Sequence, residues 1–186
     1  MLYDFVDFMN LDKEQFEFIK LLNWENVFAI WRNNEINEGH WHDYYKSKGF
    51  ESWDGWRKKY IDAYAALNKE WYLVKVKNPI ASVPNFHGGN YKGWKENFYE
   101  GHELPTFGQM KENWVAGEFL KNLPEETTII ALNTDVGVVI AEGMHRCAAI
   151  AKAAKEGKNL NLNLYIAMAD IAKEEIPDFT KDSEIK

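Results

Sequence analysis

Apolar residues in the second half of the chain change from the spacing of strands to the spacing of a helix within a few residues. Runs of apolar and β-branched residues at 127–132 and 137–140 are typical of strands, and the polar residues 133–135 between them are typical of a turn. An alanine-rich segment follows over 144–156, with Gly157 placed as a left-handed cap. We therefore predict two strands joined by a turn and followed directly by a helix.

The remaining pattern predicts more helices and strands. Asp12 and Gln15 have the spacing of a capping box, and apolar residues then recur at helical intervals until the Asn33-Asn34 pair, where we expect a break. We predict helices over 12–31, within 40–48, over 54–69 and over 106–122, and further strands over 71–76 and 160–166.

A stretch without regular period separates two of these elements. Residues 80–105 combine several glycines with aromatic side chains, and long loops of this kind in compact domains are often functional. Two interpretations are open: a loop that closes over a flat ligand ring, or a surface loop anchored by its own aromatic residues.

These elements predict an α+β fold with a small mixed sheet and flanking helices. Residues 1–70 form a helical, tryptophan-rich N-terminal extension packed on the core, residues 71–172 form the α+β domain, and residues 173–186 form an acidic C-terminal tail, either a short helix or a frayed end. Tryptophans at helical spacing are more often core residues than a cofactor site, so we expect the extension to pack against the domain.

Composition limits the classes of protein that this chain can belong to. A single cysteine, Cys147, excludes an internal disulfide framework. No apolar run approaches the roughly 18 residues of a membrane span, and the acidic start lacks the basic residues of a secretory signal, so we expect a cytoplasmic protein without a membrane partner. The net charge of −7 disfavours nucleic acid, duplexes above all, but leaves room for a local basic groove.

The candidate chemistry lies at the predicted strand–helix junction. The first N–H groups of a helix have no intrahelical partners and often bind a phosphate, so Gly143, Met144 and His145 are candidates for phosphate binding through their backbones. Arg146 adds a guanidinium that can clamp a phosphate, and Glu142 adds a carboxylate that can hold Mg²⁺ or act as a base. In the alternative, structural interpretation, Glu142 bonds the start of the helix and pairs with Arg146.

The same residues carry a resemblance to a known family. The sequence Glu142-Gly143-Met144-His145-Arg146, followed by two alanines, resembles the motif of the ParB N-terminal/sulfiredoxin-like superfamily, and the order of elements over residues 71–170 is similar. The resemblance implies the ParB/sulfiredoxin-like version of the α+β fold. It also implies that this corner binds the phosphates of a nucleotide such as ATP, ADP or CTP.

Two departures from the family indicate a stand-alone member. Sulfiredoxins have their catalytic cysteine where this chain has Met144, whereas Cys147 follows Arg146 and lies elsewhere on the helix. Partition proteins usually have two arginines in the motif and continue into a helix-turn-helix, which this sequence does not show. The form of the motif is closer to the small-molecule kinases of the superfamily and to its stand-alone members described as nucleases or ATPases.

From this resemblance we expect Mg²⁺-assisted phosphoryl transfer or NTP hydrolysis, with a possible small-molecule acceptor. Glu142, which would also hold the metal, and His145 would be catalytic, together with Glu103 from the preceding loop; Glu96 and Glu100 are alternatives to Glu103. One alternative function is a nuclease that acts on DNA with the same phosphate site. Another is a non-catalytic interaction or inhibitor module of plasmid or phage type, which would present its aromatic extension to a protein partner.

Overall fold

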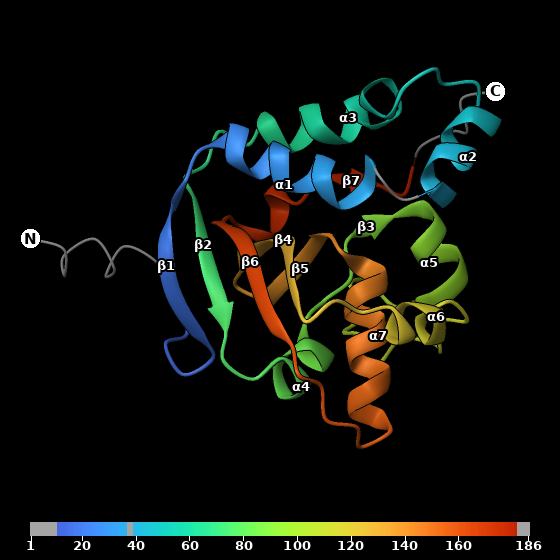
Figure 1. Ribbon diagram of the computed structural model, residues 1–186. Helices are drawn as coiled ribbons and strands as arrows, with labels where there is room; N and C mark the ends of the chain where they lie inside the picture. The colour runs from blue at the N-terminus through green and yellow to red at the C-terminus, as the bar shows by residue number, and fades with distance from the viewer. Residues whose placement is uncertain (1–10, 37–38, 182–186) are drawn as a thin grey trace, which may run out of the picture.

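A computed structural model describes residues 11–36 and 39–181 of the chain, and its centre is a mixed five-stranded sheet (Figure 1). The order is β1-β2-β6-β4-β5, in which β4 and β6 run parallel and the other neighbours antiparallel. A short parallel pair lies outside this sheet. The strands are β1 (Phe16–Leu22), β2 (Trp71–Val76), β3 (Asn90–Tyr91), β4 (Glu126–Thr134), β5 (Gly137–Glu142), β6 (Asn163–Asp170) and β7 (Asp178–Phe179).

Both faces of the sheet are buried, which explains why its central strands are almost continuously apolar. Along β4, Ile129 and Ala131 point into one core, whereas Ile130 and Leu132 point into the other. Helices α1 (Trp24–Ile36) and α3 (Trp53–Ala65) cover the second core and lie side by side in Figure 1. Helix α7 (Met144–Lys155) packs into the first core on the opposite face. The fold is therefore α+β, with a small mixed sheet between two helical layers.

Shorter helical segments complete these layers. Helix α4 (Pro79–Ser82) begins in a way that its sequence explains: Pro79 occupies the first helical position, and the Asn78 side chain accepts a hydrogen bond from the Ala81 N–H at 3.2 Å. The other segments are α2 (Gly39–Ser47), η2 (Val83–Asn85), α5 (Lys92–Phe98), α6 (Ala116–Lys121) and η3 (Lys173–Glu175).

The helix predicted over residues 12–31 is wrong in its first half, where the chain forms β1. Asp12 caps only a turn, because its side chain accepts from the Glu14 N–H at 2.9 Å and the chain then becomes extended. The reciprocal cap lies later: the Asn23 side chain accepts from the Asn26 N–H, and the Asn26 side chain accepts from the Asn23 N–H. Helix α1 begins there and continues through the asparagine pair predicted to break it.

The helix predicted over 106–122 is also wrong for most of its length, since it is helical only in α6. The backbone before α6 bonds to a distant segment, with Phe107 N–H donating to the Phe86 carbonyl and Gly108 N–H to the Pro84 carbonyl. Residues 80–105, predicted to be irregular, contain α5 and β3 and place Phe86 and Phe98 in the core. The last predicted strand is real but displaced, because β6 begins at Asn163.

Other predicted elements are confirmed. Helices α2, α3 and α7 and strands β2, β4 and β5 lie where the pattern placed them, and Gly49 and Gly157 end α2 and α7 with φ of +83° and +65°. Of the predicted acidic tail, residues 173–181 form η3, β7 and turns, and residues 182–186 lie outside the described part. Within the described ranges, no helix is both long and apolar enough to cross a membrane.

Candidate functional site at the start of α7

The junction between β5 and α7 requires a glycine at position 143. Gly143 has φ of +98°, a left-handed conformation that residues with a side chain rarely adopt. A Cβ atom at this position would also lie 2.4 Å from Cγ2 of Ile129 on the neighbouring strand β4. Because glycine meets both constraints, the chain can turn sharply from the end of β5 into α7 and stay against the sheet.

The N-terminus of α7 has no cap from its own N-cap residue. Gly143 occupies that position and offers no side-chain oxygen, and the first turn contains no acidic residue. The first intrahelical bond runs from the Cys147 N–H to the Gly143 carbonyl, so the N–H groups of Met144, His145 and Arg146 precede it. With the positive end of the helix dipole, these groups form a site that favours an anion.

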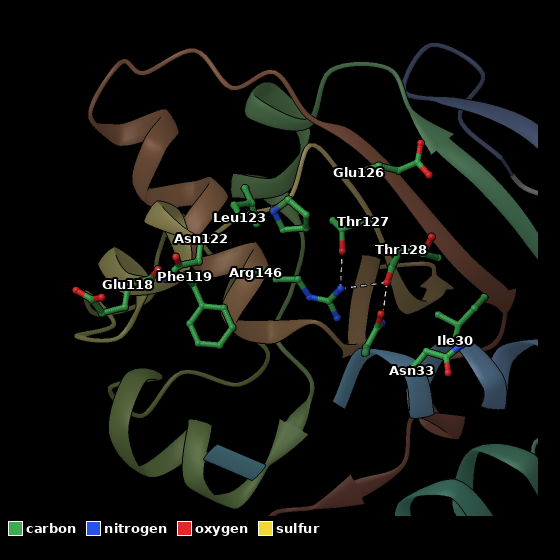
Figure 2. Close-up of a pocket in the computed structure, with 12 residues that line it drawn as sticks. Ile30, Asn33, Glu118, Phe119, Asn122, Leu123, Glu126, Thr127, Thr128 and Arg146 are labelled. Atoms are coloured by element: carbon green, nitrogen blue, oxygen red, sulfur yellow. Dashed lines mark hydrogen bonds between the residues drawn. The ribbon is translucent and has the colours of Figure 1, made fainter. Parts of the chain in front are cut away.

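Glu142 and Arg146 form a buried ion pair across this junction. One guanidinium nitrogen of Arg146 bonds Oε1 of Glu142, and the other donates to Thr127 Oγ1 at 2.6 Å and to the Thr128 carbonyl at 3.2 Å, as Figure 2 shows for the threonines. The side chains of Arg146 and Glu142 are 14% and 6% exposed. The pairing that the structural interpretation of the sequence proposed is therefore present.

Helix α1 completes this arrangement with Asn34. Its amide nitrogen donates to Oε2 of Glu142 and to the carbonyl of Thr128, each at 2.8 Å. Burial raises the pKa of Glu142 above its ordinary value, and the nearby carboxylate of Glu35 acts in the same direction, whereas Arg146 and Asn34 oppose the shift. The N-terminal region thus supplies a direct contact to the predicted site.

Glu142 as arranged does not fit Mg²⁺. The ion prefers several oxygen ligands in octahedral geometry, but both carboxylate oxygens of Glu142 already accept hydrogen bonds, one from a guanidinium. The carboxylate is also only 6% exposed beside a guanidinium, which leaves little room for the other oxygen ligands of the ion. Among residues 11–36 and 39–181, no group of three or more His, Cys, Asp or Glu side chains is arranged to hold a metal ion.

His145 lies at the start of α7 between two aromatic rings. Its ring centroid is 4.9 Å from that of Trp94 and 5.0 Å from that of Phe119, and the second pair is stacked. Nδ2 of Asn113 lies 3.2 Å from Nδ1 of the imidazole, a distance at which the amide donates to an unprotonated Nδ1. Packing on both sides of the ring fixes the orientation of His145 beside the α7 N-terminus.

A second buried ion pair, Glu35 with Arg57, lies on the same side of the sheet and was not anticipated from the sequence. Arg57 donates two hydrogen bonds to Glu35, at 2.7 and 2.8 Å, and the indole N–H groups of Trp31 and Trp53 donate to the same carboxylate at 3.2 and 2.8 Å. The guanidinium also lies 3.7 Å from the ring centroid of Trp56. A signal was present, since buried tryptophans need an acceptor for their N–H groups.

A pocket of about 320 Å³ joins these features, and we call it the α7 pocket. Residues 143–146 line one side of it, with Glu142 and Ala141, and the Glu35–Arg57 pair lines another. The remaining walls are largely aromatic and come from α2, α3, β3 and α5: Trp41, Tyr44, Trp56, Tyr60, Tyr91 and Trp94. The predicted phosphate-binding residues therefore share one pocket with a set of flat rings.

Arg146 also borders a second pocket, of about 640 Å³, which Figure 2 shows. Its lining includes Thr127 and Thr128 beside the guanidinium, but also the carboxylates of Glu118 and Glu126. Arg146 is the one cation among these lining residues. This pocket therefore has two carboxylates for one cation, whereas each carboxylate of the α7 pocket, Glu35 and Glu142, is paired with an arginine.

The structure does not bring Glu103 to the predicted site. Glu103 is exposed in the turns that follow α5, and it lines neither of the two pockets beside Arg146. Of the alternatives, Glu100 is exposed at a turn position with φ of +49°, and Glu96 is exposed on α5 and lines a different pocket. Glu142, Gly143, Met144, His145 and Arg146, in contrast, are adjacent to one another and to the α7 pocket.

The tryptophans of the N-terminal region are mostly used in packing. Trp31, Trp53 and Trp56 are buried against the sheet. Among the described residues up to position 70, the exposed large apolar side chains are Ile19, Leu21 and Tyr44. An exposed surface of tryptophan and phenylalanine, which an interaction module would use, is not found in this part.

Comparison with protein-family models, with curated proteins and with solved structures finds no match to this chain. The assignment of a function therefore depends on the site itself.

Proposed function

We propose that this protein binds the phosphate of a nucleotide in the α7 pocket. The observation that carries the proposal is the N-terminus of α7, which lacks a side-chain cap and borders a pocket with aromatic walls. The N–H groups of Met144, His145 and Arg146 would hold the phosphate oxygens, because the first-turn amides of a helix and the positive end of its dipole both favour negative charge there.

The walls of the pocket support a ligand that carries a flat ring. The volume of about 320 Å³ lies within the range of small-molecule sites, and the rings of Trp41, Tyr60 and Trp94 offer surfaces on which a base can stack. Arg57 contributes a guanidinium that Glu35 already orients. A nucleoside phosphate combines both features that the pocket offers, a phosphate and a planar ring.

The catalytic part of the proposal depends on the resemblance to the ParB/sulfiredoxin-like superfamily, which implies phosphoryl transfer or NTP hydrolysis. His145 would contact the bound phosphate directly. Glu142 would act as a base only after release from Arg146 or Asn34, and a raised pKa suits a group that accepts a proton. Because the carboxylate does not fit Mg²⁺ as arranged, no step of this proposal passes through a metal.

The two alternative functions receive less support from the described residues. A nuclease would need a basic groove directly beside Arg146, but Glu118 and Glu126 line one of the two pockets that Arg146 borders, and in the other both arginines are already paired with carboxylates. An interaction module that uses the tryptophans of residues 1–70 would need them exposed, but Trp31, Trp53 and Trp56 are buried.

A thermal-shift panel tests the proposal. ATP, ADP, CTP, GTP and inorganic phosphate are added separately to the wild-type protein, each with and without Mg²⁺, and sodium sulfate at matched ionic strength serves as a control for general anion effects. A ligand that binds the native state raises the melting temperature by mass action, by an amount that grows with its concentration. We expect a saturable shift with at least one nucleotide that exceeds the shift with phosphate, and a panel that matches the sulfate control would refute the proposal.

A further inference from the structure

A third hollow, of about 560 Å³, lies between α2, α3, α5 and β7, and we call it the lysine groove. Four lysines line it, in a chain whose net charge is −7, and two carboxylates lie among them. The lysines are Lys48, Lys58, Lys59 and Lys92, and the carboxylates are Asp62 and Glu96. The groove is thus locally basic on an acidic protein.

The two carboxylates offset only half of the lysine charge. Asp62 pairs with Lys58 at 2.7 Å, and Glu96 lies 4.0 Å from Lys92, while the Lys58 side chain remains 71% exposed and the Lys92 side chain 38% exposed. Exposed pairs of this kind contribute little energy, so an incoming anion competes for these lysines at low cost.

Aromatic rings alternate with the lysines along the groove. The Nζ atom of Lys48 lies 5.6 Å from the ring centroid of Tyr44, and that of Lys59 lies 4.9 Å from the ring centroid of Tyr60. Tyr44 is 46% exposed, which leaves much of its ring available for stacking. Tyr60 also packs against Phe179 of β7, so one side of the groove is a fixed aromatic surface.

The lysine groove adjoins the α7 pocket. Tyr44, Trp56, Tyr60, Tyr91 and Gly93 line both, so the two hollows share an aromatic wall. A ligand that is longer than one nucleotide and enters the α7 pocket would extend past this wall into the groove.

We propose that the lysine groove binds single-stranded nucleic acid, with the lysines contacting the phosphodiester backbone and the tyrosines stacking on bases. Cations interleaved with aromatic rings are the combination that binds single strands without base pairing. The strand would end with its terminal phosphate at the start of α7, a part of the inference that rests on the proposed function. An acidic peptide would satisfy the lysines but would make no use of the exposed part of the Tyr44 ring.

The test measures fluorescence anisotropy of labelled oligothymidylates of two, four, eight and twelve nucleotides, with and without a 5′-phosphate. Poly-glutamate and a twelve-base-pair duplex serve as competitors. The variant is Lys48→Gln/Lys58→Gln, and the control is Lys121→Gln. Lys121 matches Lys58, since both side chains are 71% exposed and both pair with a carboxylate at 2.7 Å on their own helix.

We expect affinity to rise with length up to the span of the groove and to fall with salt. For single strands the slope of log K against log salt is about −0.7 per phosphate contact, so the double variant should flatten the slope by about 1.4 while Lys121→Gln leaves it unchanged. Tyr44→Leu should weaken binding on the order of tenfold, because it removes one stacking surface. A 5′-phosphate should tighten binding of the shorter strands.

The outcomes separate this inference from the proposed function. If nucleotides bind but oligothymidylates bind no better, or if the double variant and Lys121→Gln behave alike, the lysine groove is not a nucleic-acid site and the α7 pocket still stands. If oligothymidylates bind through the lysines but a 5′-phosphate has no effect and nucleotides do not bind, the phosphate site at α7 is wrong. Equal competition by poly-glutamate would overturn the choice of nucleic acid.

Discussion

Replacement of Gly143 by alanine tests how closely the start of α7 approaches the sheet. Two effects oppose an alanine: φ of +98° is unfavourable for a residue with a Cβ atom, at about 1–2 kcal/mol, and the new Cβ would lie 2.4 Å from Cγ2 of Ile129. Overpacking of a filled core costs about 1–3 kcal/mol. After the gain of about 0.4–1 kcal/mol from a less flexible unfolded chain is subtracted, we expect Gly143→Ala to lower the free energy of unfolding by about 1–5 kcal/mol.

Gly157 at the other end of α7 provides a matched control. It also has positive φ, at +65°, but a Cβ atom there would have no heavy atom within 4 Å. Both substitutions share the backbone strain and the gain of about 0.4–1 kcal/mol from a less flexible unfolded chain. The difference between the two variants should therefore isolate the steric cost, about 1–3 kcal/mol.

Urea unfolding followed by tryptophan fluorescence and by far-ultraviolet circular dichroism measures both variants under the same conditions. The expected result is a lower midpoint for Gly143→Ala than for Gly157→Ala, with similar slopes in urea. Equal free energies for the two variants, within about 0.5 kcal/mol, would contradict the close contact between Gly143 and β4.

Three further predictions follow from buried groups. Arg57→Met should lower the free energy of unfolding, measured in urea, by about 3–5 kcal/mol, because it leaves the Glu35 carboxylate buried without its cation. The double variant Glu35→Gln/Arg57→Met should recover part of this loss, and a double variant no more stable than Arg57→Met would contradict the prediction. Burial raises the pKa of Glu142, so the folded state binds this proton more tightly than the unfolded state. The free energy of unfolding of the wild type should therefore fall relative to that of Glu142→Gln as the pH rises above 4.5, and a difference between the two that does not change with pH would disprove this. Burial also raises the pKa of the Cys147 thiol, so Ellman's reagent should react at the rate of unfolding, and rapid reaction of the native protein would contradict its burial.

The elements with strong local signals were predictable from the sequence. The apolar runs of β4 and β5, the glycine at 143 and the alanine-rich α7 agree with one another, because each is specified by residues close together in the chain. The same local signals correctly placed the turn at Gly143 and the helix N-terminus beside it.

Errors occurred where distant parts of the chain decide the local structure. Residues 16–22 have apolar positions compatible with a helix, but pairing with β2 makes them a strand. Residues 106–110 become turns because their backbone bonds to residues 84–86 rather than along a helix. Neither partner is visible in the local pattern.

The contacts within the site show the same limit. The pairing of Glu142 with Arg146 follows from their spacing of four residues in the sequence. The contact of Asn34 with Glu142 joins residues 108 positions apart, and the Glu35–Arg57 pair joins two helices. The sequence predicted that residues 1–70 pack on the core, but not which of their side chains would meet the site.

The most direct test of the central claim compares His145→Glu with His145→Gln. The Glu and Gln side chains have nearly the same shape. Because the positive end of the helix dipole stabilises a carboxylate in the first turn of α7, the Glu variant should be at least as stable as the Gln variant. Its charge would nevertheless repel a phosphate held by the N–H groups of the same turn. A unit charge about 6 Å away at an intermediate effective dielectric corresponds to roughly a tenfold loss of affinity.

Isothermal titration of each variant with the nucleotide that gives the largest thermal shift supplies the measurement, with urea unfolding as the stability control. The account predicts that His145→Gln binds about tenfold more tightly than His145→Glu, although it is no more stable. Equal affinities of the two variants for the nucleotide would contradict a phosphate site at the start of α7.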